Sequence, residues 1–211
     1  MIDVASLRRD FSARPFEVSD AHEDPLHQFA RWFAEARQAD ELDPNAMTLS
    51  TATRDGHPSA RVVLLKGADA RGFVFFSNFD SRKGRELDAN PFAALTFFWP
   101  TLARQIRIEG TVERVSDDEA DAYFASRPVE SRLGAWASSQ SEVVPSRAHL
   151  DARYEEMAER FGAAPPRPPH WGGYRVLPEA IEFWQGRPSR MHDRLRYRRE
   201  SSRWVIERLS P

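Results

Sequence analysis

Residues 61–84 read RVVLLKGADARGFVFFSNFDSRKG, and this stretch decides the fold around it. It predicts a strand ending at Lys66, a second strand over 73–77 and a helix that begins near Ser81. Both lysines of the chain, Lys66 and Lys83, lie here, although the chain has 30 Lys and Arg residues. Because arginine fills every other Lys or Arg position, two compact ammonium groups at these places indicate a specific role.

The helix start at Ser81 has the features of an anion site. Unpaired backbone N–H groups and the positive end of the helix dipole lie there, and Arg82 and Lys83 add formal charge. Cations in a first helical turn oppose the dipole, so we expect a negative group against them, and a phosphate is the usual one. An ordinary solvated helix start is the alternative that this pattern leaves open.

The composition limits the class of protein. The 211 residues fit one domain, and 29% charged with 41% hydrophobic residues is ordinary for a globular protein. The absence of cysteine excludes disulfides and thiolate metal sites. The start has no signal-peptide pattern and the longest apolar run, Phe92–Trp99, is too short to span a bilayer. We therefore expect a cytoplasmic protein without a membrane partner.

Short strands with a few inserted helices are predicted along the chain. Residues 1–24 are polar and aperiodic and are interpreted as a mobile arm, and residues 25–211 as one domain. Helix-start signals occur at Asp24-Pro25, Ser116 and Ser146, and Asp55-Gly56 predicts a hairpin turn. Period-two patterns predict strands over 47–53, 58–66, 73–77, 92–99, 104–115, 174–177, 181–184, 190–197 and 204–209. We expect 73–77 to pair with 58–66, in a mainly β, Greek-key barrel with helical decorations.

The predicted strand over 190–197 carries a stripe of basic side chains. Alternation places Arg190, His192, Arg194, Arg196 and Arg198 on one face. These groups would repel one another, so they need an anionic ligand, bulk water, or a carboxylate such as Glu182 or Glu207. A nucleic-acid binder would use such a stripe, but the net charge of −2 argues against it.

Other chemistries fit poorly. The six histidines lack metal-site spacing, so no metal is expected, and neither G-x-S-x-G nor G-x-G-x-x-G occurs. What remains is a barrel with separate cationic clusters and several aromatic residues, which suits an anionic, planar ligand.

A series of motifs in register resembles the pyridoxamine 5′-phosphate oxidase family over nearly the whole chain. The motifs are Arg61–Lys66, Phe76-Ser77-Asn78, Ser81-Arg82-Lys83, Arg104-Gln105, Tyr123–Pro128, Gly134–Ser141, Trp171–Tyr174, Glu182–Gly186 and Arg190–Arg194. The resemblance implies an FMN-binding split barrel that works as a homodimer with FMN at the subunit interface. It also implies oxidation of pyridoxine or pyridoxamine 5′-phosphate to pyridoxal 5′-phosphate, with O2 reduced to H2O2. A split-barrel flavin reductase, or a flavin protein with another substrate, is the alternative.

The resemblance also implies roles for single residues. The implied FMN contacts are Arg61, Val62, Val63, Leu64, Leu65, Lys66, Phe76, Ser77, Arg82, Lys83, Gln105, Gln140, Ser141, Trp184 and Arg194. The implied substrate contacts are Arg8, Arg9, Asp10 and Phe11 in a closing segment, Lys66, Tyr123, Arg127 and Ser131 at the phosphate, and Arg190, Met191 and His192 near the ring. Arg190 and His192 are the implied catalytic pair, and Asp43 matches a further family aspartate near the site. The family often has tyrosine where this chain has Phe11 and Phe76, so a hydrogen bond from either phenol is absent.

Overall fold

The computed structural model describes residue 11 and residues 13–211, and these residues form two compact units. Unit 1 comprises the described residues up to Leu49 together with Ala94–Gly110 and Pro178–Pro211. Unit 2 comprises Ser50–Ala93 and Thr111–Leu177.

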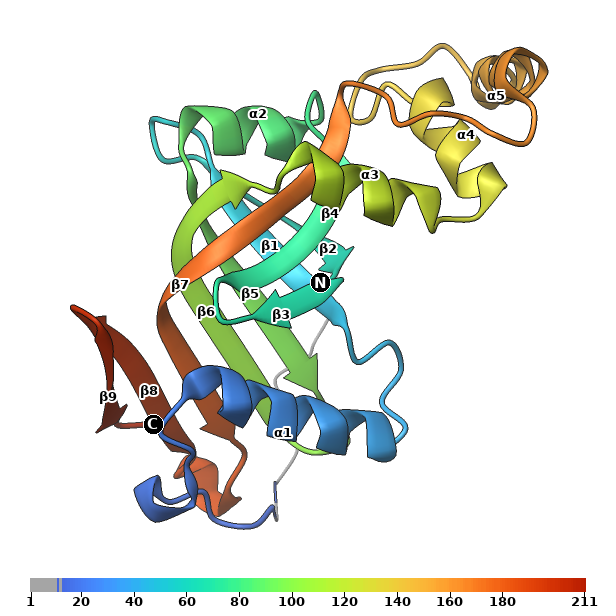
Figure 1. The fold of residues 1–211 in the computed structure, drawn as a ribbon. Coiled ribbons are helices and arrows are strands. Elements are labelled where there is room, and N and C mark those ends of the chain that lie inside the picture. The colour runs from blue at the N-terminus through green and yellow to red at the C-terminus, as the bar shows by residue number, and fades with distance from the viewer. Residues whose placement is uncertain (1–10, 12) are drawn as a thin grey trace, which may run out of the picture. The chain divides into compact units, whose positions relative to one another are not determined.

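A nine-stranded sheet runs through the described residues, in the order β2-β1-β5-β6-β7-β4-β3 with β8 and β9 continuing from β7 (Figure 1). The strands are β1 (Ala46–Ala52), β2 (Pro58–Leu64), β3 (Gly67–Asp69), β4 (Gly72–Asn78), β5 (Phe92–Trp99), β6 (Arg104–Arg114), β7 (Trp171–Gln185), β8 (Asp193–Glu200) and β9 (Arg203–Arg208). Strand β4 pairs antiparallel with β3 and β7, and β8 pairs antiparallel with β7 and β9. The predicted mainly β fold with helical decorations is confirmed.

Serine caps begin three of the helices of unit 2. The helices are α2 (Arg82–Ala89), α3 (Asp117–Ala125), α4 (Val129–Ala137) and α5 (Arg147–Phe161). The side chains of Ser81, Ser116 and Ser146 accept hydrogen bonds from the backbone N–H three residues ahead, which satisfies one otherwise unpaired donor in each helix. Figure 1 shows α4 and α5 side by side. The predicted N-caps are confirmed.

In unit 1, helix α1 (Pro25–Gln38) covers an aromatic core. The Asp24 side chain caps it by accepting from the Leu26 N–H at 2.8 Å. Its buried Phe29 packs on Phe97 with ring centroids 5.3 Å apart, and its buried Trp32 packs on Phe183 at 5.2 Å. Full burial of such side chains stabilises by roughly 1.5–3 kcal/mol each. Short 3₁₀ turns occur at Val18–Asp20 and Pro188–Arg190.

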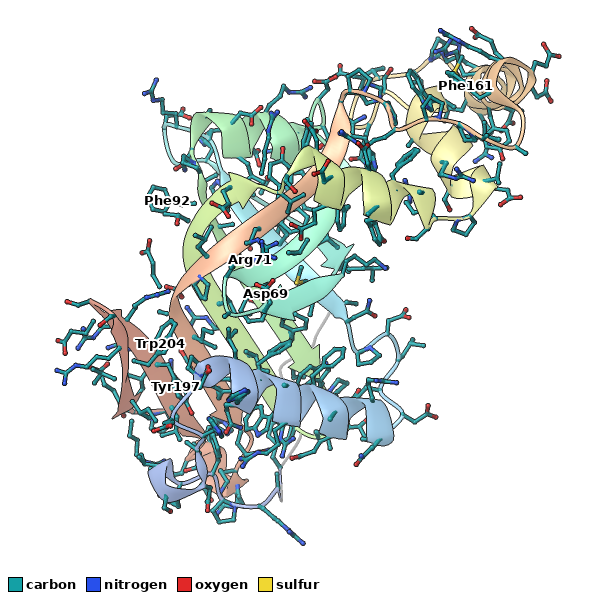
Figure 2. The ribbon with its side chains drawn as sticks, in the orientation of Figure 1. Asp69, Arg71, Phe92, Phe161, Tyr197 and Trp204 are labelled. Atoms are coloured by element: carbon teal, nitrogen blue, oxygen red, sulfur yellow. The ribbon has the colours of Figure 1, made fainter. Side chains whose placement is uncertain are left out.

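The β8–β9 pair of unit 1 carries two large aromatic side chains, Tyr197 and Trp204. Tyr197 of β8 is buried and donates its hydroxyl to the His22 carbonyl at 2.7 Å. Trp204 of β9 lies opposite Arg199, and Figure 2 labels both Tyr197 and Trp204. Among the described residues, no helix has both the length and the apolar character that a bilayer crossing requires.

Three strand predictions differ from the structure. The strand expected over 190–197 begins only at Asp193, because Ser189 and Arg190 adopt left-handed φ angles of 55° and 61°. The strand expected over 58–66 ends at Leu64, and β4 pairs with β3 and β7. Within the predicted range, Lys66 donates its N–H to the Val74 carbonyl of β4 at 2.8 Å. The two strands expected over 174–177 and 181–184 are one continuous β7 that passes through Pro178.

Candidate functional site

A cavity of about 1000 Å³ lies in unit 2. Its walls are β2, the end of β4, the start of α2, the α3–α4 junction and the segment after α4. Its cationic lining residues are Arg61, Lys66, Arg82, Lys83 and Arg127, and none of the described residues lining it is Asp or Glu. A concave site with this charge favours an anionic ligand.

The start of α2 brings the Lys83 ammonium to the cavity. Gly84 allows the tight entry into the helix, because a Cβ there would lie 1.9 Å from the Phe79 carbonyl oxygen. Lys83 is buried, and its Nζ donates to Ser77 Oγ at 3.0 Å, Ser81 Oγ at 3.2 Å and Gln140 Oε1 at 2.8 Å. Burial lowers the pKa of Lys83 to about 8, and the charge of Arg61 adds to the effect. All three oxygens are neutral, so no carboxylate offsets the ammonium charge at these contacts.

The α3–α4 junction contributes a second cation. Arg127 follows α3, and its guanidinium carbon lies 4.7 Å from the Trp171 ring centroid, at cation–π distance. Its Nη1 atom is buried and makes no hydrogen bond to any described residue. Burial lowers the pKa of the Arg127 guanidinium, and Tyr123 partly opposes this. A buried N–H without a partner costs about 1–3 kcal/mol, which an anionic ligand in the cavity would recover.

An aromatic stack supports this junction. The Phe76 ring stacks on Tyr123 at 3.9 Å and on Trp171 at 5.6 Å, with interplanar angles of 19° and 12°. Gly173 of β7 makes room for it, because a Cβ at that position would lie 2.8 Å from the Phe76 ring. Phe76, Tyr123 and Trp171 all line the cavity.

The structure brings together most site residues that the sequence predicts within unit 2. The predicted residues that line the cavity are Arg61, Val62, Val63, Leu64, Lys66, Phe76, Ser77, Arg82, Lys83, Tyr123, Arg127, Ser131, Gln140 and Ser141. Leu65 is buried and does not line it. Val62 is 68% exposed and Leu64 42%, so an apolar face of β2 is left open in the single chain.

The remaining predicted residues lie in unit 1. Trp184 and His192 pack with ring centroids 4.6 Å apart, and Phe11 approaches Trp184 edge-on at 5.7 Å. The Nδ1 atom of His192 accepts the Arg187 N–H at 3.1 Å. Burial and the charge of Arg190 lower the pKa of His192. These contacts fix the orientation of the imidazole ring.

Arg194 and Arg196 of the basic stripe are paired with carboxylates, which is one of the three alternatives that the sequence left open. Arg194 donates to Glu182 at 2.8 and 3.1 Å, and Arg196 donates to Glu207 at 2.6 Å. Arg190 and Met191 are exposed residues of the turn before β8. Gln105 lies on β6, Asp43 has a φ of 48° before β1, and Arg8, Arg9 and Asp10 lie outside the described residues.

Glu86 and Trp171 belong to this site and were not predicted as site residues. Glu86 bonds Arg61 and Arg82 from behind the cavity wall, and its position four residues after Arg82 on α2 was a detectable signal. Trp171 opens the Trp171–Tyr174 motif, but nothing in its sequence context shows that its ring faces Arg127.

Comparison with known proteins agrees with this geometry. A family model described as pyridoxamine 5′-phosphate oxidase matches residues 33–161, and one described as the pyridoxine 5′-phosphate oxidase C-terminal dimerisation region matches residues 171–211. A protein of Burkholderia multivorans named pyridoxine/pyridoxamine 5′-phosphate oxidase is 59% identical over 214 residues, which cover 100% of both chains.

Two solved structures are similar in fold. The crystal structure of PhzG from Burkholderia lata in complex with tetrahydrophenazine-1-carboxylic acid matches with a TM-score of 0.90 and 35% identity, over 95% of this chain and 100% of that one. An FMN-binding protein from Nostoc punctiforme, described as pyridoxamine 5′-phosphate oxidase-related, matches with a TM-score of 0.70 and 16% identity, over 90% of this chain and 100% of that one. The second likeness bears on the fold alone, and it confirms the predicted split barrel. Since a family model covers residues 33–161 and a relative is 59% identical along the full length, the chain belongs to the pyridoxamine 5′-phosphate oxidase family.

Proposed function

We propose that the protein is an FMN-dependent oxidase that converts pyridoxamine or pyridoxine 5′-phosphate to pyridoxal 5′-phosphate, with O2 reduced to H2O2. The observation that carries this proposal is the cavity of unit 2, where two groups of cations face a lining without Asp or Glu. Two phosphorylated ligands, a cofactor and a substrate, need two such groups.

The first group suits the FMN phosphate. Arg61, Arg82 and Lys83 supply charge, and Ser77 and Gln140 supply polar atoms beside the ammonium. The neutral hydrogen-bond partners of Lys83 fit this role, because the ammonium charge is left for a ligand to balance. When bound, FMN supplies the redox chemistry, so the protein has to bind, orient and shield the reactants.

The second group suits the substrate phosphate. Arg127 offers its buried Nη1, which has no partner among the described residues. Tyr123 and Ser131 line the same cavity and carry hydroxyl groups. Lys66 lines the cavity as well and is exposed. Arginine captures a phosphate with paired N–H donors, which fixes the orientation of the ligand as well as its position.

The residues of unit 1 complete the site in a homodimer. We assign Gln105, Trp184 and Arg194 to the flavin at the subunit interface, and Arg190, Met191 and His192 to the substrate ring. The matched C-terminal dimerisation region and the exposed apolar face of β2 support a dimer. Arg8 to Phe11 are proposed to close over the substrate.

His192 has a defined state for this task. Because its Nδ1 accepts the Arg187 N–H, the neutral ring carries its proton on Nε2. Burial and Arg190 lower its pKa, which favours the neutral ring. We therefore assign His192 as a hydrogen-bond donor to the substrate through Nε2, held in place by Trp184.

The test is to purify the protein, record its visible spectrum and measure oxidation of both vitamer phosphates with formation of H2O2. We expect a yellow dimer with about one FMN per chain. Arg190→Ala and His192→Ala should each lower turnover at least about tenfold with FMN retained, and His57→Ala, on an exposed hairpin, serves as the matched control.

Three results would argue against the proposal. A colourless protein that takes up no FMN would rule out FMN as the cofactor. A flavoprotein that oxidises neither vitamer would favour a split-barrel flavin reductase or another substrate. Wild-type turnover in both Arg190→Ala and His192→Ala would remove the catalytic assignment.

A further inference from the structure

A buried carboxylate, Glu86, lies behind the cationic wall of the cavity. Glu86 belongs to α2 and is 5% exposed, yet it is not among the cavity lining. Its Oε1 accepts from Arg82 Nε at 2.8 Å. Its Oε2 accepts from Thr51 Oγ1 at 2.5 Å, Ser59 Oγ at 2.5 Å and Arg61 Nη2 at 3.4 Å. Two cavity cations therefore share one carboxylate.

Glu86 is ionised in the folded protein. Burial alone would raise its pKa, but hydrogen bonds from Ser59, Thr51 and Arg82 outweigh burial and lower the pKa to about 2. A carboxylate with this many donors is a fixed anchor, because each donor restricts where the others can lie.

Glu86 holds the two arginines through different atoms. Arg82 uses Nε for Glu86, and its terminal amino groups make no hydrogen bond to the described residues. Arg61 is held on its inner side, with Nη1 donating to Thr51 at 2.5 Å and Nη2 donating to Ser59 and Glu86. Both arginines line the cavity beside Lys83.

A carboxylate so close to an anion site weakens the attraction for a phosphate, so it needs a reason to be there. Arg61 already contributes to the low pKa of Lys83, which shows that the cations repel one another. Without Glu86, the two guanidinium groups and the ammonium would move apart, or the ammonium of Lys83 would lose its proton. With it, three cations can lie in one wall.

We propose that Glu86 is a positioning residue that holds Arg61 and Arg82 in the orientation that receives the phosphate of FMN. This inference rests on the proposed function, because it takes FMN as the ligand of that wall. Glu86 does not line the cavity, so it would act on a ligand there through the two arginines.

The experiment compares FMN with riboflavin, which has the same ring system and lacks the phosphate. Apoprotein is titrated with each flavin while flavin fluorescence is followed, for wild type and Glu86→Gln. Loss of a hydrogen bond to a charged group should weaken FMN binding about 10- to 100-fold. The riboflavin Kd should change less than about threefold, since riboflavin does not use the arginines.

Two further variants make the result specific. Asp88→Asn removes a carboxylate from the same helix, where Asp88 pairs with Arg114 outside the cavity, and should change neither Kd. Thr51→Val keeps the charge of Glu86 but removes one of its neutral donors and, with it, the acceptor of Arg61 Nη1. It loosens the same anchor, so it should weaken FMN about 3- to 10-fold and leave riboflavin unchanged. This variant tests the inference even if Glu86→Gln does not fold.

The outcomes separate this inference from the proposed function. Equal losses for FMN and riboflavin would show a merely structural role for Glu86 and overturn the inference. Wild-type FMN affinity in Glu86→Gln, or in Thr51→Val if Glu86→Gln does not fold, would overturn it too, with the flavin assignment intact. A wild-type apoprotein that binds riboflavin no more weakly than FMN would overturn the phosphate wall itself, and with it the proposed function.

Discussion

Two arginines of unit 2 have opposite surroundings. Arg175 is 1% exposed and donates to Glu119 at 2.7 Å and to Asp69 at 3.0 Å, and Figure 2 labels Asp69 beside Arg71 at the β3–β4 turn. Arg127 has a buried Nη1 without a partner among the described residues. Arg175 is therefore satisfied within the fold, whereas Arg127 carries a cost that a ligand would remove.

Replacement by leucine should separate these two roles. Arg175→Leu leaves carboxylates without their partner and should lower the free energy of unfolding by about 2–4 kcal/mol. Arg127→Leu removes an unsatisfied donor and a cation–π contact together, so stability should stay within about 1 kcal/mol of wild type. Urea unfolding of the apoprotein measures both. Equal destabilisation by the two changes would contradict the assignment of Arg127 to a ligand.

The low pKa of Lys83 predicts how FMN affinity depends on pH. In the free protein this ammonium loses its proton near pH 8, whereas a bound phosphate favours the charged form. Above that pH, binding takes up a proton, so the Kd for FMN should rise by up to about tenfold per pH unit. The phosphate group is already doubly ionised there, because its second pKa is about 6.

Lys83→Arg is the control for this pH dependence. Arginine stays charged over the whole range, so its Kd should vary much less between about pH 7 and about pH 9. Fluorescence titrations at several pH values measure the slope. A wild-type Kd that is constant or falls over this range would be inconsistent with Lys83 at the phosphate.

At the scale of elements, β7 positions the α3–α4 junction through its glycines. Gly173 pairs with Phe76 between β7 and β4 and leaves room for its ring, and Phe76 stacks on Tyr123 of α3. The same helix is tied to β7 by the bond between Glu119 and Arg175. Tyr123 therefore owes its place to contacts made by residues far from it in the sequence.

Gly173→Ala tests this support. The new Cβ would lie 2.6 Å from Val115 Cγ2 and 2.8 Å from the Phe76 ring, so the ring must shift. We expect a loss of about 1–3 kcal/mol in stability and a KM for the vitamer phosphate that is several-fold higher. Gly67→Ala is the control, since its Cβ would meet only Val74 at 3.8 Å. An unchanged KM in Gly173→Ala would show that the stack does not position Tyr123.

At the scale of the whole molecule, the proposed flavin contacts come from both units. Lys83 belongs to unit 2, whereas Trp184 and Arg194 belong to unit 1. In the proposed dimer, each flavin takes the first set from one subunit and the second set from its partner. A mutation in each set then damages different parts of one shared site.

Mixed dimers provide the test of this arrangement. Lys83→Ala and Arg194→Ala homodimers should both bind FMN poorly. Random mixing of the two chains places both defects in the same site of a mixed dimer and leaves its other site intact, so about a quarter of all sites should recover. FMN retained after gel filtration measures the recovery. No recovery in verified mixed dimers would place both sets in the same subunit.

The sequence by itself determined the features that depend on neighbouring residues. The caps at Asp24, Ser81 and Ser146 follow from hydrogen bonds within three residues. The cationic wall of the cavity was predictable from the basic residues and the helix start within residues 61–84. Strand existence was predictable because period-two alternation is a local pattern. Charge alone also predicted that the basic stripe needs an anion, a carboxylate or water, and the structure supplies Glu182 and Glu207.

Only the tertiary structure decided the features that join distant segments. The pairing of β4 with β7, the burial of Arg175 and the hydrogen bond from Thr51 to Glu86 join residues that are far apart in the chain. Such contacts depend on which surfaces the folded chain brings together, and no local pattern specifies that. The left-handed turn at Ser189 and Arg190 is of this kind, because period two predicted a strand there and contacts with distant residues, such as the hydrogen bond from Arg187 Nη1 to the Ala13 carbonyl, hold a turn instead.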